Sequence, residues 1–301
     1  MKKFIGRTVV FVLLMWALDT VIGLGCRYLT THAKSGDTAR NYTIVNRMDA
    51  DIVLFGSSRC IHHYDPRILS DSLHATCYNC GSNGMGIILF YAYYRMMTER
   101  YKPKVVIYDI LPGFDLLKSD NYSYLSWLRP YYDHNGIDSL FWTVSTTERY
   151  KMMSQMYRYN GKILQMITDN VVTIREEHDG YRPMDGELSY DIDNDIESVA
   201  ETDSLKMYYM ERLIESCKIN GTQLIFTVSP LYKSGMKAME AYKPLYLLAE
   251  KHEIPVLNHF TDTAFINDKT LFWDSFHMNR KGAERYTRTI VKEIKFLGLE
   301  I

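Results

Sequence analysis

The sequence lacks an excess of charge of either sign, and it lacks a cysteine framework. Its 301 residues carry 35 Lys and Arg against 36 Asp and Glu, a net charge of −1, without any block rich in Lys and Arg. This balance argues against nucleic acid as the main partner. The five cysteines are odd in number and show no framework spacing, so a disulfide-stapled fold is not expected. We expect buried thiols, with a disulfide as the alternative in an exported domain.

Patterns that bind metal ions are also scarce. Cys77 and Cys80 form a single CxxC pair without a second pair or paired histidines, which argues against zinc. The stretch DIDND at 191–195 resembles the start of a calcium loop, but it has no Gly at the sixth position and no Glu at the twelfth. We therefore expect neither a metal ion nor a cofactor.

The longest apolar run lies near the N-terminus. Lys and Arg residues precede residues 8–25, an apolar stretch in which Asp19 is the single charge. Its length is close to that needed to cross a bilayer, and the preceding cations would stay on the cytoplasmic side. A cleaved signal peptide would have a shorter apolar region and a small-residue cleavage site, which is missing here. We interpret residues 1–30 as a membrane anchor, with residues 31–301 exported to the periplasmic or extracellular face; a buried helix of a soluble protein is the alternative.

Beyond the anchor, strand patterns alternate with helical patterns. Strands are expected at 51–57, 76–81, 104–111, 222–230 and 254–260, and helices from Pro66 and at 86–99, 203–219, 235–251 and 279–297. Such alternation indicates βαβ units, and hence an α/β domain with a parallel sheet of about five strands and helices on both faces. Residues 116–200 interrupt the rhythm and are rich in Tyr and Trp. These aromatic residues would either line a carbohydrate cleft or form a small core of their own.

The ends of the strands carry the candidate chemistry. Ligands of an open parallel sheet bind beyond the carboxyl ends of its strands, so the loops 56–58, 79–84 and that after Leu111 should meet. A serine nucleophile needs a base, and the base needs a group that orients it. Asp274 and His277 stand three residues apart just before the last helix, where one turn can aim both side chains at a strand-end serine. A surface turn that caps the helix is the alternative for this pair.

Three of these stretches resemble a known family. FGSSR at 55–59, NCGSNG at 79–84 and DSFHMNRKG at 274–282 resemble blocks I, II and V of the SGNH (GDSL-like) hydrolase superfamily. The resemblance covers most of the chain after the anchor, and it implies a three-layer αβα domain of the flavodoxin-like type.

The resemblance also implies roles for individual residues. Ser58 would be the nucleophile, His277 its general base, and Asp274 the group that orients the base. The backbone N–H groups of Ser58 and Gly84 would bind the oxyanion.

Block III departs from the family pattern. Phe114, in LPGFDLL at 111–117, stands where the family has an Asn that donates to the oxyanion. Loss of one such donor commonly lowers turnover by about 10²–10³-fold. Asn83 is the candidate to replace the donor, and Arg59 is the candidate either to hold an anionic group of the substrate or to pair with Asp115. Arg59, Asn83 and Phe114 are also the candidates for contact with the substrate.

Other polar residues near these loops have weaker claims. We expect His62 and His63 to be exposed at a helix entry, and Ser229 at most to line the cleft.

Gly56-Ser57-Ser58 stands where the SGNH family has Gly-Asp-Ser. This Gly-Ser-Ser variant on an N-terminal anchor is similar to exported SGNH-like proteins of cell-envelope acylation, such as those of alginate O-acetylation and teichoic-acid D-alanylation. This similarity implies a serine-dependent esterase or O-acyltransferase that acts on acyl esters, acetyl esters foremost, of envelope polysaccharide. It also implies a membrane-bound O-acyltransferase as partner. The alternative, which Phe114 favours, is a non-catalytic envelope component that binds glycan or a membrane partner.

Overall fold

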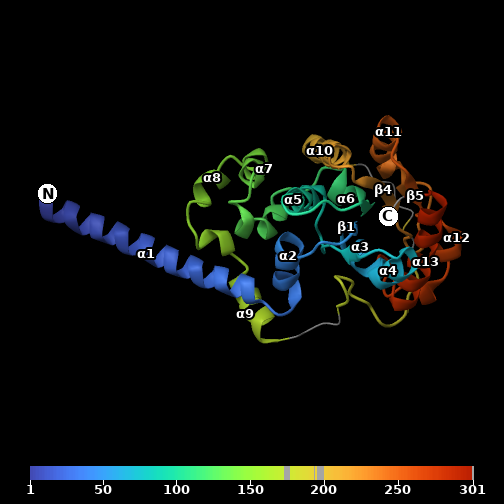
Figure 1. Cartoon of the computed structure of the whole chain (residues 1–301), viewed down its shortest axis with the longest axis horizontal. Helices are drawn as coiled ribbons and strands as arrows, with labels where there is room; N and C mark the ends of the chain where they lie inside the picture. The colour runs from blue at the N-terminus through green and yellow to red at the C-terminus, as the bar shows by residue number, and fades with distance from the viewer. Residues whose placement is uncertain (173–176, 193, 195–199, 300–301) are drawn as a thin grey trace. The chain divides into compact units, whose positions relative to one another are not determined.

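The computed structural model describes residues 1–172, 177–192, 194 and 200–299, and the chain divides into two compact units (Figure 1). We call Met1–Arg47 with Asn121–Arg175 the helical unit, and Met48–Asp120 with Glu176–Ile301 the sheet unit. The division expected from the sequence, at residues 30 and 31, stays a prediction.

The sheet unit is built on five parallel strands in the order β2-β1-β3-β4-β5. The strands are β1 (Ile52–Gly56), β2 (Cys77–Asn79), β3 (Val105–Asp109), β4 (Gln223–Val228) and β5 (Val256–Asn258). This is the doubly wound order of flavodoxin-like folds. The expected α/β fold class is therefore confirmed, and each of the five expected strands is present.

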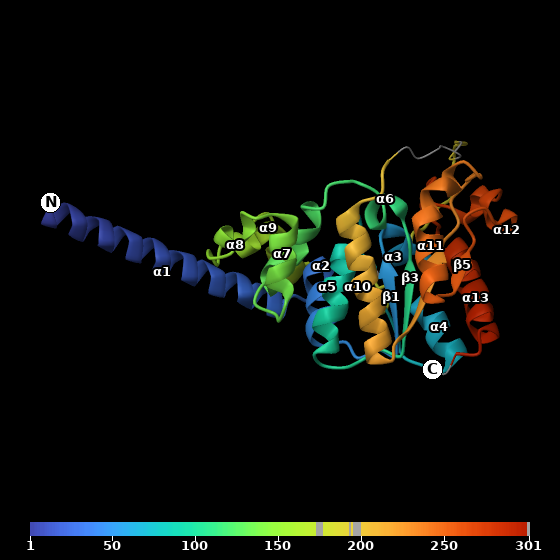
Figure 2. The same ribbon diagram turned by 90° about the horizontal axis from the view of Figure 1, so that it is seen from above.

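Helices cover both faces of the sheet. The helices α3 (Ser58–His63), α4 (Pro66–Leu73) and α13 (Arg280–Phe296) pack together on one face, and α5 (Ile87–Thr98) and α10 (Ser204–Asn220) on the other (Figure 2). Alternate side chains of the strands point to opposite faces. Ile52 and Leu54 therefore join the core under α13, whereas Phe55 stacks on Phe90 of α5 with ring centroids 5.5 Å apart.

Shorter elements complete the sheet unit. They are α6 (Pro112–Asp115), η4 (Ala238–Tyr242), α11 (Lys243–His252), α12 (Thr263–Ile266) and η5 (Lys269–Leu271). The sequence placed one helix at 235–251, but the α-helix begins only at Lys243, after a 3₁₀ turn. Pro244 explains the late start, because proline lacks an N–H group and suits the first turn of a helix.

The helical unit consists of α1 (Lys2–His32), α2 (Gly36–Asn46), η1 (Ser123–Trp127), η2 (Arg129–Tyr131), α7 (Ile137–Val144), α8 (Glu148–Lys151), η3 (Tyr157–Tyr159) and α9 (Ile163–Val171). Among the described residues, α1 is the one helix long and apolar enough to cross a membrane, with a mean hydropathy of 2.2 in its most apolar part. A membrane anchor and a signal sequence both have this character. Side chains of α1 are exposed up to Leu18, and α9 and α2 contact its C-terminal part (Figure 1).

The aromatic residues of the insertion pack mainly on one another and on neighbouring cations. Tyr124 and Tyr131 are buried, and the guanidinium of Arg129 lies over the rings of Tyr122 and Tyr157 at 5.5 and 5.1 Å. Of the two alternatives that the sequence left open, a small core is therefore present, and α1 contributes Cys26 to it. The five cysteines are free, buried thiols, as expected.

Candidate active site

The turn after β1 depends on the missing side chain of Gly56. This residue has φ +144°, and a Cβ atom there would lie 2.7 Å from the carbonyl oxygen of Asp109 at the end of β3. Glycine therefore lets β1 and β3 approach closely where they end. Ser57 is buried as the N-cap residue of α3, and Ser58 is the first residue of that helix. The chain thus presents the Ser58 hydroxyl at the carboxyl end of the sheet, where doubly wound folds bind ligands.

Ser58, His277 and Asp274 form a hydrogen-bonded chain. His277 Nε2 lies 2.8 Å from Ser58 Oγ, and His277 Nδ1 lies 2.9 Å from Asp274 Oδ2. A carboxylate accepts hydrogen bonds only, so Nδ1 carries the ring proton and Nε2 is left to accept the proton of the serine hydroxyl. These atoms meet across 219 residues of sequence. The geometry is that of a serine nucleophile, its base and the group that orients the base.

The Asp274 carboxylate is held in its charged form. Its Oδ1 atom accepts hydrogen bonds from the backbone N–H groups of Phe276 and His277, both at 2.7 Å. Burial by itself raises the pKa of Asp274, but the hydrogen bonds from His277 and Phe276 outweigh burial and lower this pKa below its ordinary value. The negative charge is therefore kept where it can stabilise an imidazolium on His277.

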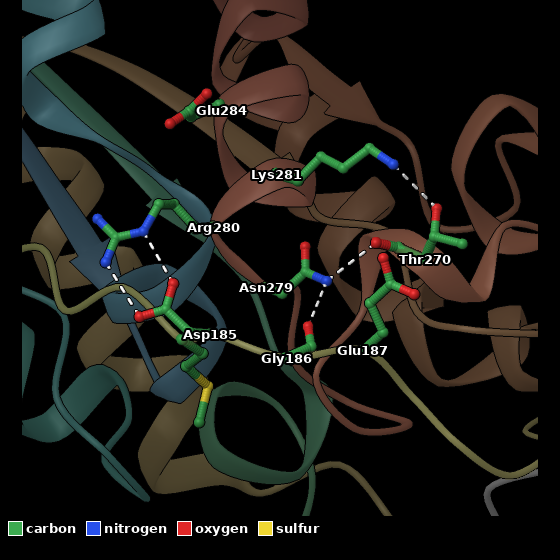
Figure 3. A pocket seen from close by; sticks show the side chains of 9 residues that line it. Asp185, Gly186, Glu187, Thr270, Asn279, Arg280, Lys281 and Glu284 are labelled. Carbon is green, nitrogen blue, oxygen red and sulfur yellow. Dashed lines mark hydrogen bonds and ion pairs between the residues drawn. The ribbon is translucent and has the colours of Figure 1, made fainter.

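Asn279 fastens the loop that carries His277. Its Oδ1 atom accepts from the N–H of Gly282 and so caps α13, while its Nδ2 atom donates to the carbonyl oxygens of Gly186 and Thr270 at 2.7 and 2.9 Å (Figure 3). Arg280 forms an ion pair with Asp185 beside it. Residues 185 and 186 thus bind both Asn279, next to the loop that carries His277, and Arg280, the first residue of α13.

His62 and His63 were expected to be exposed, and this prediction is wrong. His63 is fully buried, and its Nε2 atom accepts a hydrogen bond of 2.9 Å from the backbone N–H of Met278, the residue after His277. Burial and the nearby His277 lower the pKa of His63 well below its ordinary value, so the ring is neutral. The His62 ring packs edge-on against His277, with ring centroids 5.5 Å apart. Both rings therefore position His277 rather than face solvent.

The sequence suggested Asp115 as a partner of Arg59, but in the structure Arg59 has other partners. Its guanidinium is buried, donates to the carbonyl oxygen of Ile110 at 2.8 Å and lies 4.0 Å from a carboxylate oxygen of Asp109. Ser229, which we expected at most to line the cleft, is buried and donates to Asp109 through both its N–H and its hydroxyl. A buried arginine with these partners is a structural cation beneath the strand ends, and this position speaks against direct contact of Arg59 with an anionic substrate.

Asp115 has its own set of partners. Tyr108 Oη donates to Asp115 Oδ1 at 2.6 Å, and the N–H of Leu111 donates to Oδ2 at 2.8 Å. Burial raises the pKa of Asp115 to about 7, although the hydrogen bond from Tyr108 acts to lower it.

The loops expected to bind the oxyanion lie beside the Ser58 turn. The N–H of Ser82 donates to the carbonyl oxygen of Gly56 at 3.0 Å, which holds the loop 79–84 next to the end of β1. Gly84 has φ +69° and open space around the position of a Cβ atom. A Cβ on Gly86 would lie 2.1 Å from the carbonyl oxygen of Phe114, so α6 packs directly on the start of α5. The oxyanion roles of Ser58 and Gly84, and the substrate roles of Asn83 and Phe114, remain predictions.

In the part of the chain that the structure describes, no three His, Cys, Asp or Glu side chains gather into a group that could hold a metal ion. Residues 193 and 195 of the calcium-like stretch lie outside that part.

Comparisons with known proteins place these observations in context. No family model and no curated protein sequence matches the chain. Solved structures with a similar course of the chain include a proposed acylhydrolase from Bacteroides fragilis (10% identity, 83% of this chain and 88% of that chain, TM-score 0.42). They also include a proposed lipolytic protein of the G-D-S-L family from Desulfitobacterium hafniense (10% identity, 80% and 97%, TM-score 0.40). A proposed platelet activating factor from Streptococcus pneumoniae is a third (12% identity, 96% and 99%, TM-score 0.43).

The strand order of the sheet, and the positions of Ser58 after β1 and of Asp274 and His277 before the last helix, are those that the resemblance to the SGNH superfamily implied. Sequence reasoning missed Asp109 as a supporting group and gave His63 and Ser229 other roles. The partners of these three residues lie 50 to 215 residues away, and no local pattern signals such contacts.

Proposed function

We propose that the protein is a serine-dependent esterase or O-acyltransferase. The observation that carries this proposal is the chain of hydrogen bonds from Ser58 Oγ through His277 to Asp274, at 2.8 and 2.9 Å. A serine hydroxyl is a poor nucleophile near neutral pH until a positioned base removes its proton. Here the base is already within hydrogen-bond distance and in the required tautomer.

The reaction would run in two half-reactions. Ser58 Oγ attacks the acyl carbon while its proton passes to His277 Nε2, and the N–H groups of Ser58 and Gly84 bind the oxyanion that forms. Collapse of the tetrahedral intermediate breaks the ester bond, and His277 returns the proton to the departing alkoxide. Water or a sugar hydroxyl then attacks the acyl-serine, again with His277 as base, and restores Ser58.

The proposed substrates are acyl esters, acetyl esters foremost, of cell-envelope polysaccharide. Two features support this assignment: the resemblance of the Gly-Ser-Ser variant to exported acylation proteins, and the apolar helix α1 at the N-terminus. With α1 as a membrane anchor, the rest of the chain lies on the periplasmic or extracellular face, and a membrane-bound O-acyltransferase is the proposed partner.

The test is to trap the acyl-enzyme. Full-length protein in detergent is treated with p-nitrophenyl acetate or with a serine-reactive phosphonate, and mass spectrometry locates the adduct. We expect the adduct on Ser58, its loss in Ser58→Ala, and its retention in the matched variant Ser57→Ala, which removes the neighbouring buried hydroxyl. Absence of any adduct on Ser58 in folded protein would favour the non-catalytic glycan-binding component, which the Phe114 departure also supports.

The proposed topology has a separate test. A reporter fused after residue 40 should be active only outside the cytoplasm, because the cations before residue 8 would stay inside. Activity confined to the cytoplasm would contradict the export of the sheet unit.

A further inference from the structure

The single acidic residue of the apolar stretch, Asp19, binds a turn of the helical unit. Ser154 Oγ donates to Asp19 Oδ1 at 2.6 Å, and the N–H groups of Gln155 and Met156 donate to the same carboxylate at 2.7 and 3.0 Å. A Cβ on Gly23, one helical turn later, would lie 2.4 Å from the Cβ of Gln155. The turn after α8 therefore packs directly on the backbone of α1.

The position of Asp19 along α1 sets the depth of this turn. Arg7 and Arg27 bracket the apolar part of the helix. At 1.5 Å per residue, the helix between them is about 28 Å long, which matches a hydrocarbon core of about 30 Å. Asp19 would then lie about 12 Å inside the outer boundary of that core. If the core ended at Asp19 instead, the helix within it would be only about 17 Å long, too short to span.

The N–H groups of the turn meet the requirement that the bilayer sets for hydrogen-bond donors. A backbone N–H exposed to hydrocarbon without a partner costs several kcal/mol. Every N–H from Tyr150 to Tyr157 has an acceptor: those of residues 150–154 bond to backbone carbonyls of residues 147–151, those of Gln155 and Met156 to Asp19, and that of Tyr157 to Ser154 Oγ. Asp19 thus accepts hydrogen bonds from the two N–H groups for which the turn itself offers no acceptor.

The side chains around the turn have the character of a membrane surface. Large apolar side chains are exposed at Tyr150 (65%), Met153 (78%), Met156 (45%) and Leu164 (82%). Arg149 lies over the rings of Trp142 and Tyr150. Aromatic rings with nearby cations are typical of the boundary between acyl chains and headgroups.

We propose that Tyr150–Met156, which is the end of α8 and the turn that follows it, enters the outer leaflet beside α1, with Met153 and Met156 among the acyl chains. The occupant of this apolar surface is lipid, because the turn packs on α1 at Asp19 and Gly23, a position within the expected depth of the hydrocarbon core. The helical unit therefore contacts the membrane twice: through α1, which spans it, and through this segment, a wedge that enters the outer leaflet only. This inference rests on the proposed role of α1 as a membrane anchor. It assigns the aromatic-rich segment 116–200 a role in membrane contact instead of glycan binding.

The test measures what surrounds Met153 in the full-length protein. Met153→Cys is spin-labelled after reconstitution into phosphatidylcholine–phosphatidylglycerol vesicles, and its collision rates with oxygen and with a water-soluble nickel chelate are compared. Labelling is selective because the five native cysteines are buried. Leu14→Cys in α1 is the reference for lipid, and Ile219→Cys, an apolar residue of the sheet unit that is 83% exposed, is the reference for water.

We expect the ratio of oxygen to nickel collisions at Met153→Cys to be closer to that of Leu14→Cys than to that of Ile219→Cys. A water-like ratio at Met153 with a lipid-like ratio at Leu14 would overturn the wedge and leave the anchor standing. Low rates for both reagents at Met153 would mean that a second copy of the chain covers the turn, and this also would overturn lipid contact. A water-like ratio at Leu14 would refute the anchor and the wedge together.

Discussion

The candidate site depends on a few groups that hold one imidazole. Asp274 fixes the tautomer of His277, and His63 accepts the backbone hydrogen bond from Met278 that follows it. A base is effective only when the reacting proton lies within hydrogen-bond distance, so these contacts decide whether Ser58 is a nucleophile or an ordinary strand-end hydroxyl.

Ser58, His277 and Asp274 act together in one step, so removal of Ser58 or His277 should also abolish the rate enhancement that the other residues provide. We expect Ser58→Ala and His277→Ala each to lower kcat for p-nitrophenyl acetate by about 10⁴-fold or more, and the double variant to lose about the same amount. Residual activity is measured with purified full-length protein, and circular dichroism confirms the fold. Full activity of Ser58→Ala would contradict the mechanism, and additive losses would contradict a shared step.

Asp115 should make stability depend on pH. Its folded pKa of about 7 lies above the ordinary value near 4, so the folded state keeps a proton that the unfolded state has already lost between these values. The free energy of unfolding therefore falls as pH rises from about 4 to about 7, by up to about 1.4 kcal/mol per pH unit. Urea denaturation of Asp115→Asn at several pH values should show a flatter slope than the wild type; parallel curves would show that Asp115 is charged in the folded protein.

Among the elements, α5 begins beside a position that has no room for a side chain. Gly86 precedes α5 and has an extended backbone with φ −143°, so any residue could adopt its conformation. Its position is restricted by the Phe114 backbone, which leaves no space for a Cβ. The main chains of Gly86 and Phe114 are thus in direct contact where α6 meets the start of α5.

Gly86→Ala should therefore be destabilising for steric reasons alone. We expect a loss of about 1–3 kcal/mol in the free energy of unfolding, because the Phe114 loop has to move away from α5. Gly113→Ala is the matched control, since a Cβ at Gly113 meets nothing within 4 Å. Denaturant unfolding of both variants measures the difference, and equal stabilities would show that the loop adjusts freely.

At the scale of the whole molecule, the helical unit is built from two segments that are distant in sequence. Cys26 of α1 packs with Tyr159 and Met166, and the N–H of Thr38 donates to the Asp169 carboxylate at 3.0 Å. Neither segment can bury these groups by itself. The sheet unit, by contrast, has its own core under α13.

A chain that begins at Met48 should therefore lose structure in one unit only. We expect fast hydrogen exchange throughout 121–172, where the apolar partners of α1 would be exposed, and unchanged protection in β1 and β3. Exchange measured by mass spectrometry on both chains checks this expectation. Unchanged protection in 121–172 would show that the insertion folds without α1 and α2.

The sequence by itself indicated the five strands and the candidate reacting groups. Continuous apolar runs ending at Gly56 and Asp109 predict buried parallel strands, because a strand covered on both faces is apolar throughout. Ser58, Asp274 and His277 became candidates through the resemblance of the stretches around them to the SGNH superfamily, and their catalytic roles stay a proposal. Only the tertiary structure decided which charges meet: Arg59 lies beside Asp109, His63 is buried under the His277 loop, and Asp19 is satisfied by residues 154–156. These partners are brought together by the packing of helices on a sheet and on α1, and no pattern within either partner's own segment specifies where the other will lie.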